Sequence, residues 1–149
     1  MNTAKGPVGA QLIEGYLQSR QMRYFCGHHD DEFFFLVNAY HGRLHVHLQP
    51  DDSAVYISIT AERYYPADRR AGVAALVQQW NDTAPHAAAS VLSSCDPRLV
   101  GVVAERRYHP GDGEFGPVID RTIQSAIDLF GRLRAVVASS DDSHLRDAG

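Results

Sequence analysis

The stretch of residues 55–82 changes its hydrophobic period from two residues to 3.6, and this change most constrains the fold. Apolar and more polar side chains alternate over residues 55–62, which is typical of a strand with one buried face. Beyond a corner at residues 65–68, apolar side chains recur at i, i+3, i+4 and i+7, namely Val73, Leu76, Val77 and Trp80. Pro66 suits the first turn of a helix, because proline has a fixed φ and no amide donor. The stretch predicts a strand, a corner and an amphipathic helix that begins at Pro66.

The corner is repeated downstream. Residues 61–68 read AERYYPAD, and residues 104–112 read AERRYHPGD, which is the same pattern with one residue inserted. The second copy predicts a strand over residues 99–108 and a final helix that Pro117 opens, with a weaker strand at residues 86–93.

The first half of the chain completes the order of elements. Helical spacing of apolar residues predicts a helix over residues 8–22, which Gly9 and Gly15 weaken. The run FFFLV at residues 33–37 is apolar on both faces, short and aromatic, and so predicts a central strand. Residues 43–49 alternate cleanly. Short connections between these strands predict an antiparallel meander.

These elements give the order α-β-β-β-α-β-β-α. Runs of adjacent strands favour an α+β fold with a five-stranded antiparallel sheet and helices packed on one face. The chain of 149 residues suits one domain. We expect a flexible leader at residues 1–7, a single domain at residues 8–137 and a disordered, polar tail at residues 138–149.

Charge and cysteine usage exclude several classes of protein. The net charge of −4 argues against a general nucleic-acid binder, which needs a basic surface. No apolar run approaches membrane-spanning length and the first residues lack a secretory apolar core, so we expect a soluble cytoplasmic protein. Cys26 and Cys95 form no CxxC pair. A disulfide between them stays open, and free, partly buried thiols are favoured.

His45 and His47 point to the same side of their strand, because side chains at i and i+2 share a face. Histidine is a frequent metal ligand, and the nearby segment 28–31 (HHDD) offers further ligands. The alternative is that these histidines line the solvent side of a half-buried sheet.

The same face supports a second hypothesis. With matching register, it carries a polar, semi-aromatic set suited to a protein partner or a second copy of the chain, made of His45, His47, Gln49, Tyr56, Ser58 and Thr60. The alternative is an ordinary antiparallel face covered by water.

Other candidates have simpler explanations. Tyr64 and Tyr65, like the equivalent residues at the second corner, Tyr108 and His109, suit a small-ligand cleft, although corner aromatics more often pack over a helix start. The carboxylates of Glu62 and Glu105 suggest acid–base chemistry, but ion pairs with neighbouring arginines also explain them. Residues 111–116 match GxGxxG, yet two acidic residues within them would repel phosphate.

The helix from Pro66 to Trp80 and Asn81 resembles the middle helix of the YbjN-like family, described as bacterial sensory-transduction regulators. The charged strand end, the Gly/Asp-rich loop and the helix containing residues 119–130 resemble that family again. The likeness covers roughly residues 12–133 and leaves the histidine-rich region 28–47 unmatched. It implies a type III secretion chaperone-like fold and a small, non-enzymatic protein that is often dimeric and binds other proteins.

From the residues and this resemblance we expect a non-catalytic, chaperone-like or regulatory protein-interaction module of the bacterial cytoplasm, as a homodimer. We expect no catalytic residue, metal or cofactor, and no nucleic-acid or membrane partner. The alternative is a small-ligand or metal-binding sensor that uses the histidine-bearing sheet face.

Overall fold

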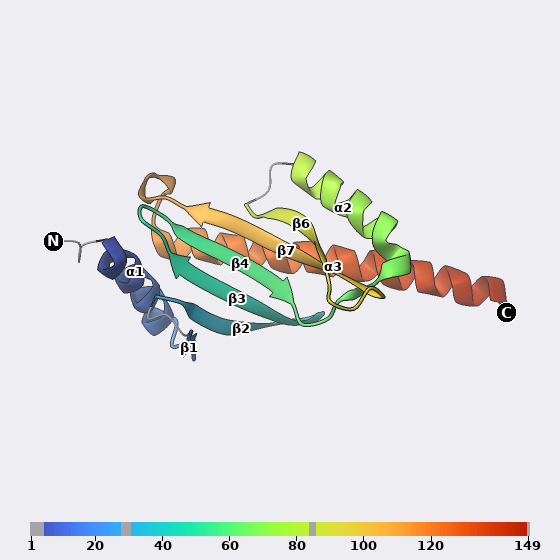
Figure 1. The fold of residues 1–149 in the computed structure, drawn as a ribbon, viewed down its shortest axis with the longest axis horizontal. Coiled ribbons are helices and arrows are strands. Elements are labelled where there is room, and N and C mark those ends of the chain that lie inside the picture. The colour runs from blue at the N-terminus through green and yellow to red at the C-terminus, as the bar shows by residue number, and fades with distance from the viewer. Residues whose placement is uncertain (1–4, 28–30, 84–85, 149) are drawn as a thin grey trace.

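The computed structural model describes residues 5–27, 31–83 and 86–148, with side chains described for these residues except 5–8 and 139–148. Within these residues, three α-helices and two short 3-10 helices accompany one sheet. Figure 1 shows how the α-helices lie around the sheet. The helices and strands, in chain order, are α1 (Lys5–Ser19), β1 (Phe25–Cys26), β2 (Phe33–Ala39), β3 (Gly42–Pro50), β4 (Val55–Ala61), β5 (Tyr65–Pro66), η1 (Ala67–Arg69), α2 (Arg70–Asp82), β6 (Ala88–Ser93), β7 (Leu99–Tyr108), η2 (Pro110–Asp112) and α3 (Phe115–Ala148).

The sheet is antiparallel, as predicted, in the strand order β1-β2-β3-β4-β7-β5, with β6 also paired to β7. It has seven strands, so the predicted count of five is wrong. The two additional strands, β1 and β5, contain two residues each, which is too short to show an alternating pattern. The run FFFLV lies in β2, which is second from the edge and not central.

Pro66 does not open the middle helix. Pro66 lies in β5, where it pairs with Leu99 of β7, and the 3-10 turn η1 precedes α2. Proline cannot donate to a ladder and is therefore confined to positions such as this sheet edge. The adjacent amide of Ala67 donates to the Arg98 carbonyl at 2.7 Å, which holds the corner against β7.

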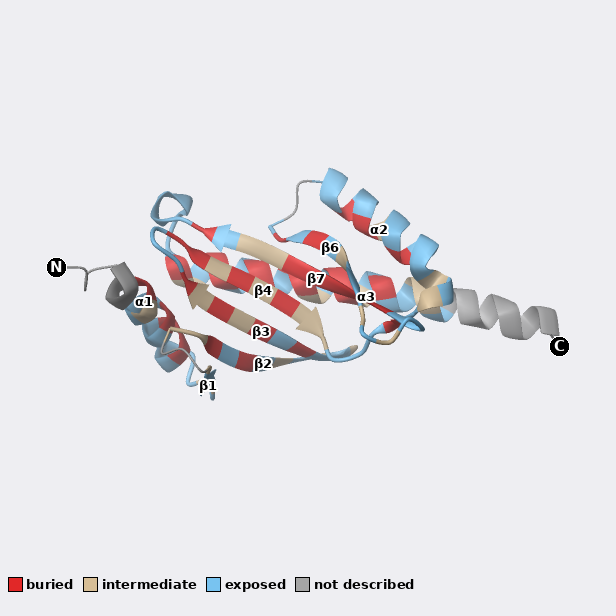
Figure 2. Ribbon diagram, in the orientation of Figure 1, coloured by how far each residue is buried: buried red, intermediate tan, exposed pale blue. Residues whose placement is uncertain are grey.

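A single core lies between one face of the sheet and the helices. Figure 1 shows α3 passing behind β4 and β7, and Figure 2 shows buried positions recurring along both the strands and α3. The same cluster of buried side chains includes Ile13 and Leu17 of α1, Val73 and Val77 of α2, and Leu129 and Phe130 of α3. The sheet contributes inward residues of several strands, among them Leu44, Val46, Leu48, Ile57 and Ile59 of β3 and β4.

The ends of the chain differ from the expected leader and tail. Residues 1–4 lie outside the described residues, and α1 begins at Lys5. The structure continues α3 to Ala148, through the segment for which the sequence predicts a disordered tail. That part of the helix contains no glycine or proline to end it. The domain boundaries themselves stay predictions.

Both cysteines are free, as the sequence favours, but they are exposed and not partly buried. Cys26 ends the short edge strand β1, and Cys95 lies in the turn between β6 and β7. In the described part of the chain, no helix combines the length and the apolar character needed to cross a membrane.

Gly9 and Gly15 of α1 are expected to respond in opposite ways to alanine substitution. A Cβ on Gly9 would lie 2.5 Å from the Cβ of Pro50, whereas a Cβ on Gly15 would meet nothing within 4 Å. Gly9→Ala should push α1 away from β3 and lower the free energy of unfolding by about 1–3 kcal/mol. Gly15→Ala should raise it by about 0.5–1 kcal/mol through helix propensity. Urea denaturation of both variants checks this, and equal effects would contradict the close packing of α1 on β3.

Candidate functional site

The register of β3 and β4 brings all six predicted interface residues together on the sheet face opposite the core. His45 lies directly opposite Thr60, His47 opposite Ser58, and Gln49 opposite Tyr56. Their inward neighbours, such as Val46 and Ile59, are buried, so the outward set is the solvent side of a half-buried sheet. We call this side of the sheet the outer face.

The outer face also carries apolar side chains that the sequence analysis did not select. Phe25, Phe34 and Leu36 are exposed there to 67%, 38% and 43%. Phe34 is opposite His47 and Leu36 is opposite His45, while Phe25 is opposite Phe34 on the edge strand β1. The signal was present in the run FFFLV, whose apolar character on both faces suits a strand with something on each side.

These side chains surround a shallow hollow of about 420 Å³, which we call the outer groove. Its outward-facing lining residues are Phe25, Phe34, Leu36, His45, His47, Ser58 and Thr60. The ring of Phe34 stacks on the imidazole of His47, with centroids 4.5 Å apart and planes within 10°. The Nε2 atom of His47 is buried and has no hydrogen-bond partner among the described residues. The groove therefore combines apolar side chains of β1 and β2 with polar side chains of β3 and β4.

Tyr56, at the β7 side of the outer face, forms a hydrogen bond with a residue of its own chain. Its hydroxyl donates a hydrogen bond to the carboxylate of Glu105, and the neighbouring Arg107 pairs with Asp51 at 3.5 Å. Glu62 lies beyond the end of β4, while Glu105 lies opposite Ser58. The structure therefore does not bring the two carboxylates together as an acid–base pair.

Among the described residues, the structure places no further metal ligands beside His45 and His47. Within the part of the chain that the structure describes, no three His, Cys, Asp or Glu side chains are grouped so that they could hold a metal ion. His28, His29 and Asp30 of the predicted ligand set lie outside the described residues.

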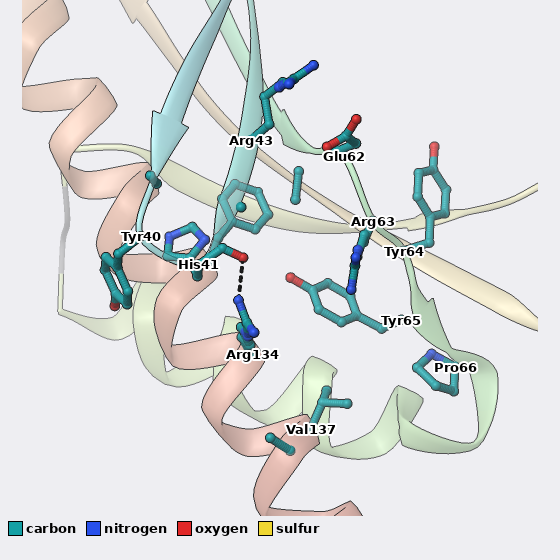
Figure 3. Close-up of a pocket in the computed structure, with 15 residues that line it drawn as sticks. Tyr40, His41, Arg43, Glu62, Arg63, Tyr64, Tyr65, Pro66, Arg134 and Val137 are labelled. Atoms are coloured by element: carbon teal, nitrogen blue, oxygen red, sulfur yellow. Dashed lines mark hydrogen bonds between the residues drawn. The ribbon is translucent and has the colours of Figure 1, made fainter.

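A second pocket, of about 650 Å³, lies where the β2–β3 turn and the β4–β5 corner meet α3. We call it the corner pocket. Tyr65 lines it, as one hypothesis for the corner tyrosines requires, and is 9% exposed. Burial raises the pKa of Tyr65 to about 12, so its hydroxyl remains a hydrogen-bond donor at neutral pH. Figure 3 shows this hydroxyl directed towards the middle of the pocket, whereas Tyr64 points away.

The second corner is structural instead. The hydroxyl of Tyr108 donates to the Gly113 carbonyl at 2.7 Å, and its ring packs edge-on against Phe115 at the start of α3. The Asp112 carboxylate accepts the His109 amide at 2.9 Å and so closes the 3-10 turn η2. The GxGxxG segment thus runs from this 3-10 turn into the first two residues of α3.

Comparison with known proteins bears on the fold alone. No model of a protein family matches the chain, and no curated protein matches it. Among solved structures, an uncharacterized protein from Methanothermobacter thermautotrophicus is similar, with a TM-score of 0.51 and 12% sequence identity. The match covers 87% of this chain and 99% of the other chain. At this identity the likeness shows that the two chains share a fold, and it transfers no activity.

Proposed function

We propose that this protein is a non-catalytic, chaperone-like or regulatory protein-interaction module of the bacterial cytoplasm that forms a homodimer through its outer face. The observation that carries the proposal is the outer groove, in which Phe25, Phe34 and Leu36 expose apolar surface beside His45 and His47. The three α-helices of the described chain contribute side chains to the core on the other side of the sheet, which leaves this face available to a partner.

The composition of the outer face suits a second copy of the chain. Interfaces combine an apolar, aromatic centre with a polar rim, and two-fold interfaces must be self-complementary. Phe25, Phe34 and Leu36 would form the centre, since they are the large exposed apolar side chains that line the outer groove. The rim would be Gln49, Ser58 and Thr60, whose side chains both donate and accept hydrogen bonds. The YbjN-like resemblance, with its often dimeric members, agrees with this arrangement.

The test is the solution mass of wild-type protein and of a His45→Glu/His47→Glu variant, by size-exclusion chromatography with light scattering. We expect the wild type to elute with the mass of two chains and the variant with the mass of one, because four carboxylates would be buried in the interface. A Gln11→Glu/Gln18→Glu variant adds the same charge at exposed positions of α1 and should stay dimeric.

The proposal fails if the wild type is monomeric at high concentration and captures no partner from a cell extract. A dimer that both double variants leave intact would place the interface elsewhere and remove the role of the outer face.

A further inference from the structure

The corner pocket shares no lining residue with the outer groove, so the two can act independently. Its volume of about 650 Å³ falls within the range of roughly 300–1,000 Å³ that small-molecule sites occupy. Three separate parts of the chain form its walls, and these are the β2–β3 turn, the β4–β5 corner and the second half of α3 (Figure 3).

Positive charge is concentrated in this pocket. Arg43, Arg63 and Arg134 line it, against the single carboxylate of Glu62. The whole chain has a net charge of −4, so a local excess of cations is not a reflection of its composition. Arg43 and Arg63 form no ion pair with any described residue. A guanidinium presents a planar fork of donors that matches phosphate and carboxylate oxygens.

The pocket is held in shape by contacts between the β2–β3 turn and α3. Arg134 donates from Nη1 to the His41 carbonyl at 2.6 Å, and His41 Nε2 lies 2.9 Å from the Ile127 carbonyl, as a hydrogen bond. The Tyr40 hydroxyl lies so close to Gly131 that a Cβ at that position would clash with it. A pre-formed pocket loses less conformational entropy when a ligand binds.

Apolar surface adjoins the arginines. Phe130, which is 1% exposed, and the partly buried Val137 line the pocket from α3, and Pro66 lines it from β5. The Tyr65 hydroxyl, which points into the same space, adds a neutral donor. A ligand that fills the pocket would therefore have an anionic group and an apolar or aromatic body.

We propose that the corner pocket binds a small organic anion, whose phosphate or carboxylate group is held by Arg63 and Arg134, with Arg43 adding positive charge at the rim, and whose apolar body lies against Phe130 and Val137. The proposal does not depend on dimerisation through the outer face, because the two sets of residues are separate.

The test is isothermal titration calorimetry with phenyl phosphate, which has both parts of the expected ligand. We expect saturable binding at millimolar or lower concentration, weaker binding of inorganic phosphate, and no detectable binding of benzyl alcohol. Benzoate in place of phenyl phosphate distinguishes a carboxylate site from a phosphate site. Affinity should fall as salt rises, because solvent-facing charge pairs are screened.

Arg43→Met/Arg63→Met should weaken phenyl phosphate binding at least tenfold, since hydrogen bonds to charged groups are the strong ones. Arg23→Met/Arg121→Met removes the same charge at exposed positions outside the pocket and should bind like the wild type. Circular dichroism checks that both double variants fold. Equal affinity of the two variants, or no binding of either phenyl phosphate or benzoate to the wild type, would overturn the proposal.

A second measurement locates the ligand without any substitution. Amide chemical shifts in a ¹H–¹⁵N spectrum should change on adding phenyl phosphate at Gly42, Tyr65 and Phe130. Changes confined to other parts of the chain, the outer face included, would equally overturn the assignment.

Discussion

Phe35→Ala is expected to lower the free energy of unfolding by about 3–5 kcal/mol, whereas Phe34→Ala is expected to lower it by about 1 kcal/mol or less. The two residues are neighbours in β2 and face opposite sides of the sheet. Phe35 is 1% exposed in the core, so its loss leaves a cavity. Phe34 is 38% exposed and packs chiefly on the His47 ring, so its loss leaves little unfilled space. Urea denaturation of both variants at low protein concentration measures the difference.

The same pair of variants also tests the interface when the protein concentration is raised. A dimer gains stability with concentration by mass action. The cost of Phe34→Ala should therefore grow at high concentration if Phe34 lies in the interface, and the cost of Phe35→Ala should not. Equal costs for the two variants at low concentration would contradict the assignment of the faces.

The alternation of apolar and polar residues along the strands was the most informative feature of the sequence. Because the side-chain period of a strand is two, placing Val46 and Ile59 in the core fixes His45, His47, Ser58 and Thr60 on the outer face. The same reasoning cannot detect β1 and β5, since two residues show no period. Pro66 was misassigned because its missing amide donor suits both a helix start and an edge strand.

The corner pocket could not be predicted from the sequence, for a different reason. Its cations, Arg43, Arg63 and Arg134, come from three segments, and none of these segments is basic over its length. Only Tyr64, Tyr65 and Glu62 were selected from the sequence, by their place at the repeated corner. Tyr64 then proves to pack over Gly101 of β7, where a Cβ would lie 3.2 Å from its ring. Local patterns predict elements and faces, whereas a pocket depends on how the ends of several elements meet.

Trp80→Ala is expected to lower the free energy of unfolding by about 3–5 kcal/mol, the usual cost of removing a buried tryptophan. Trp80 is 7% exposed, and its indole Nε1 donates to the Ala87 carbonyl at 2.8 Å. Next to it, the Asn81 side chain both donates to the Ala89 carbonyl and accepts the Ala89 amide, at 2.9 Å and 2.8 Å. Together the two residues fasten the end of α2 to the segment that enters β6.

Trp80→Phe separates the hydrogen bond from the packing. It keeps a buried ring but leaves the carbonyl of the fully buried Ala87 without its donor, so we expect a loss of about 1–3 kcal/mol. Arg132→Met, which removes the guanidinium 5.2 Å above the indole centroid, should cost about 0.5–1 kcal/mol and serves as the control. Far-ultraviolet circular dichroism is the suitable probe, because Trp80 is the single tryptophan and its fluorescence is lost with it. If Trp80→Phe unfolds like the wild type, the bond to Ala87 does not fasten α2.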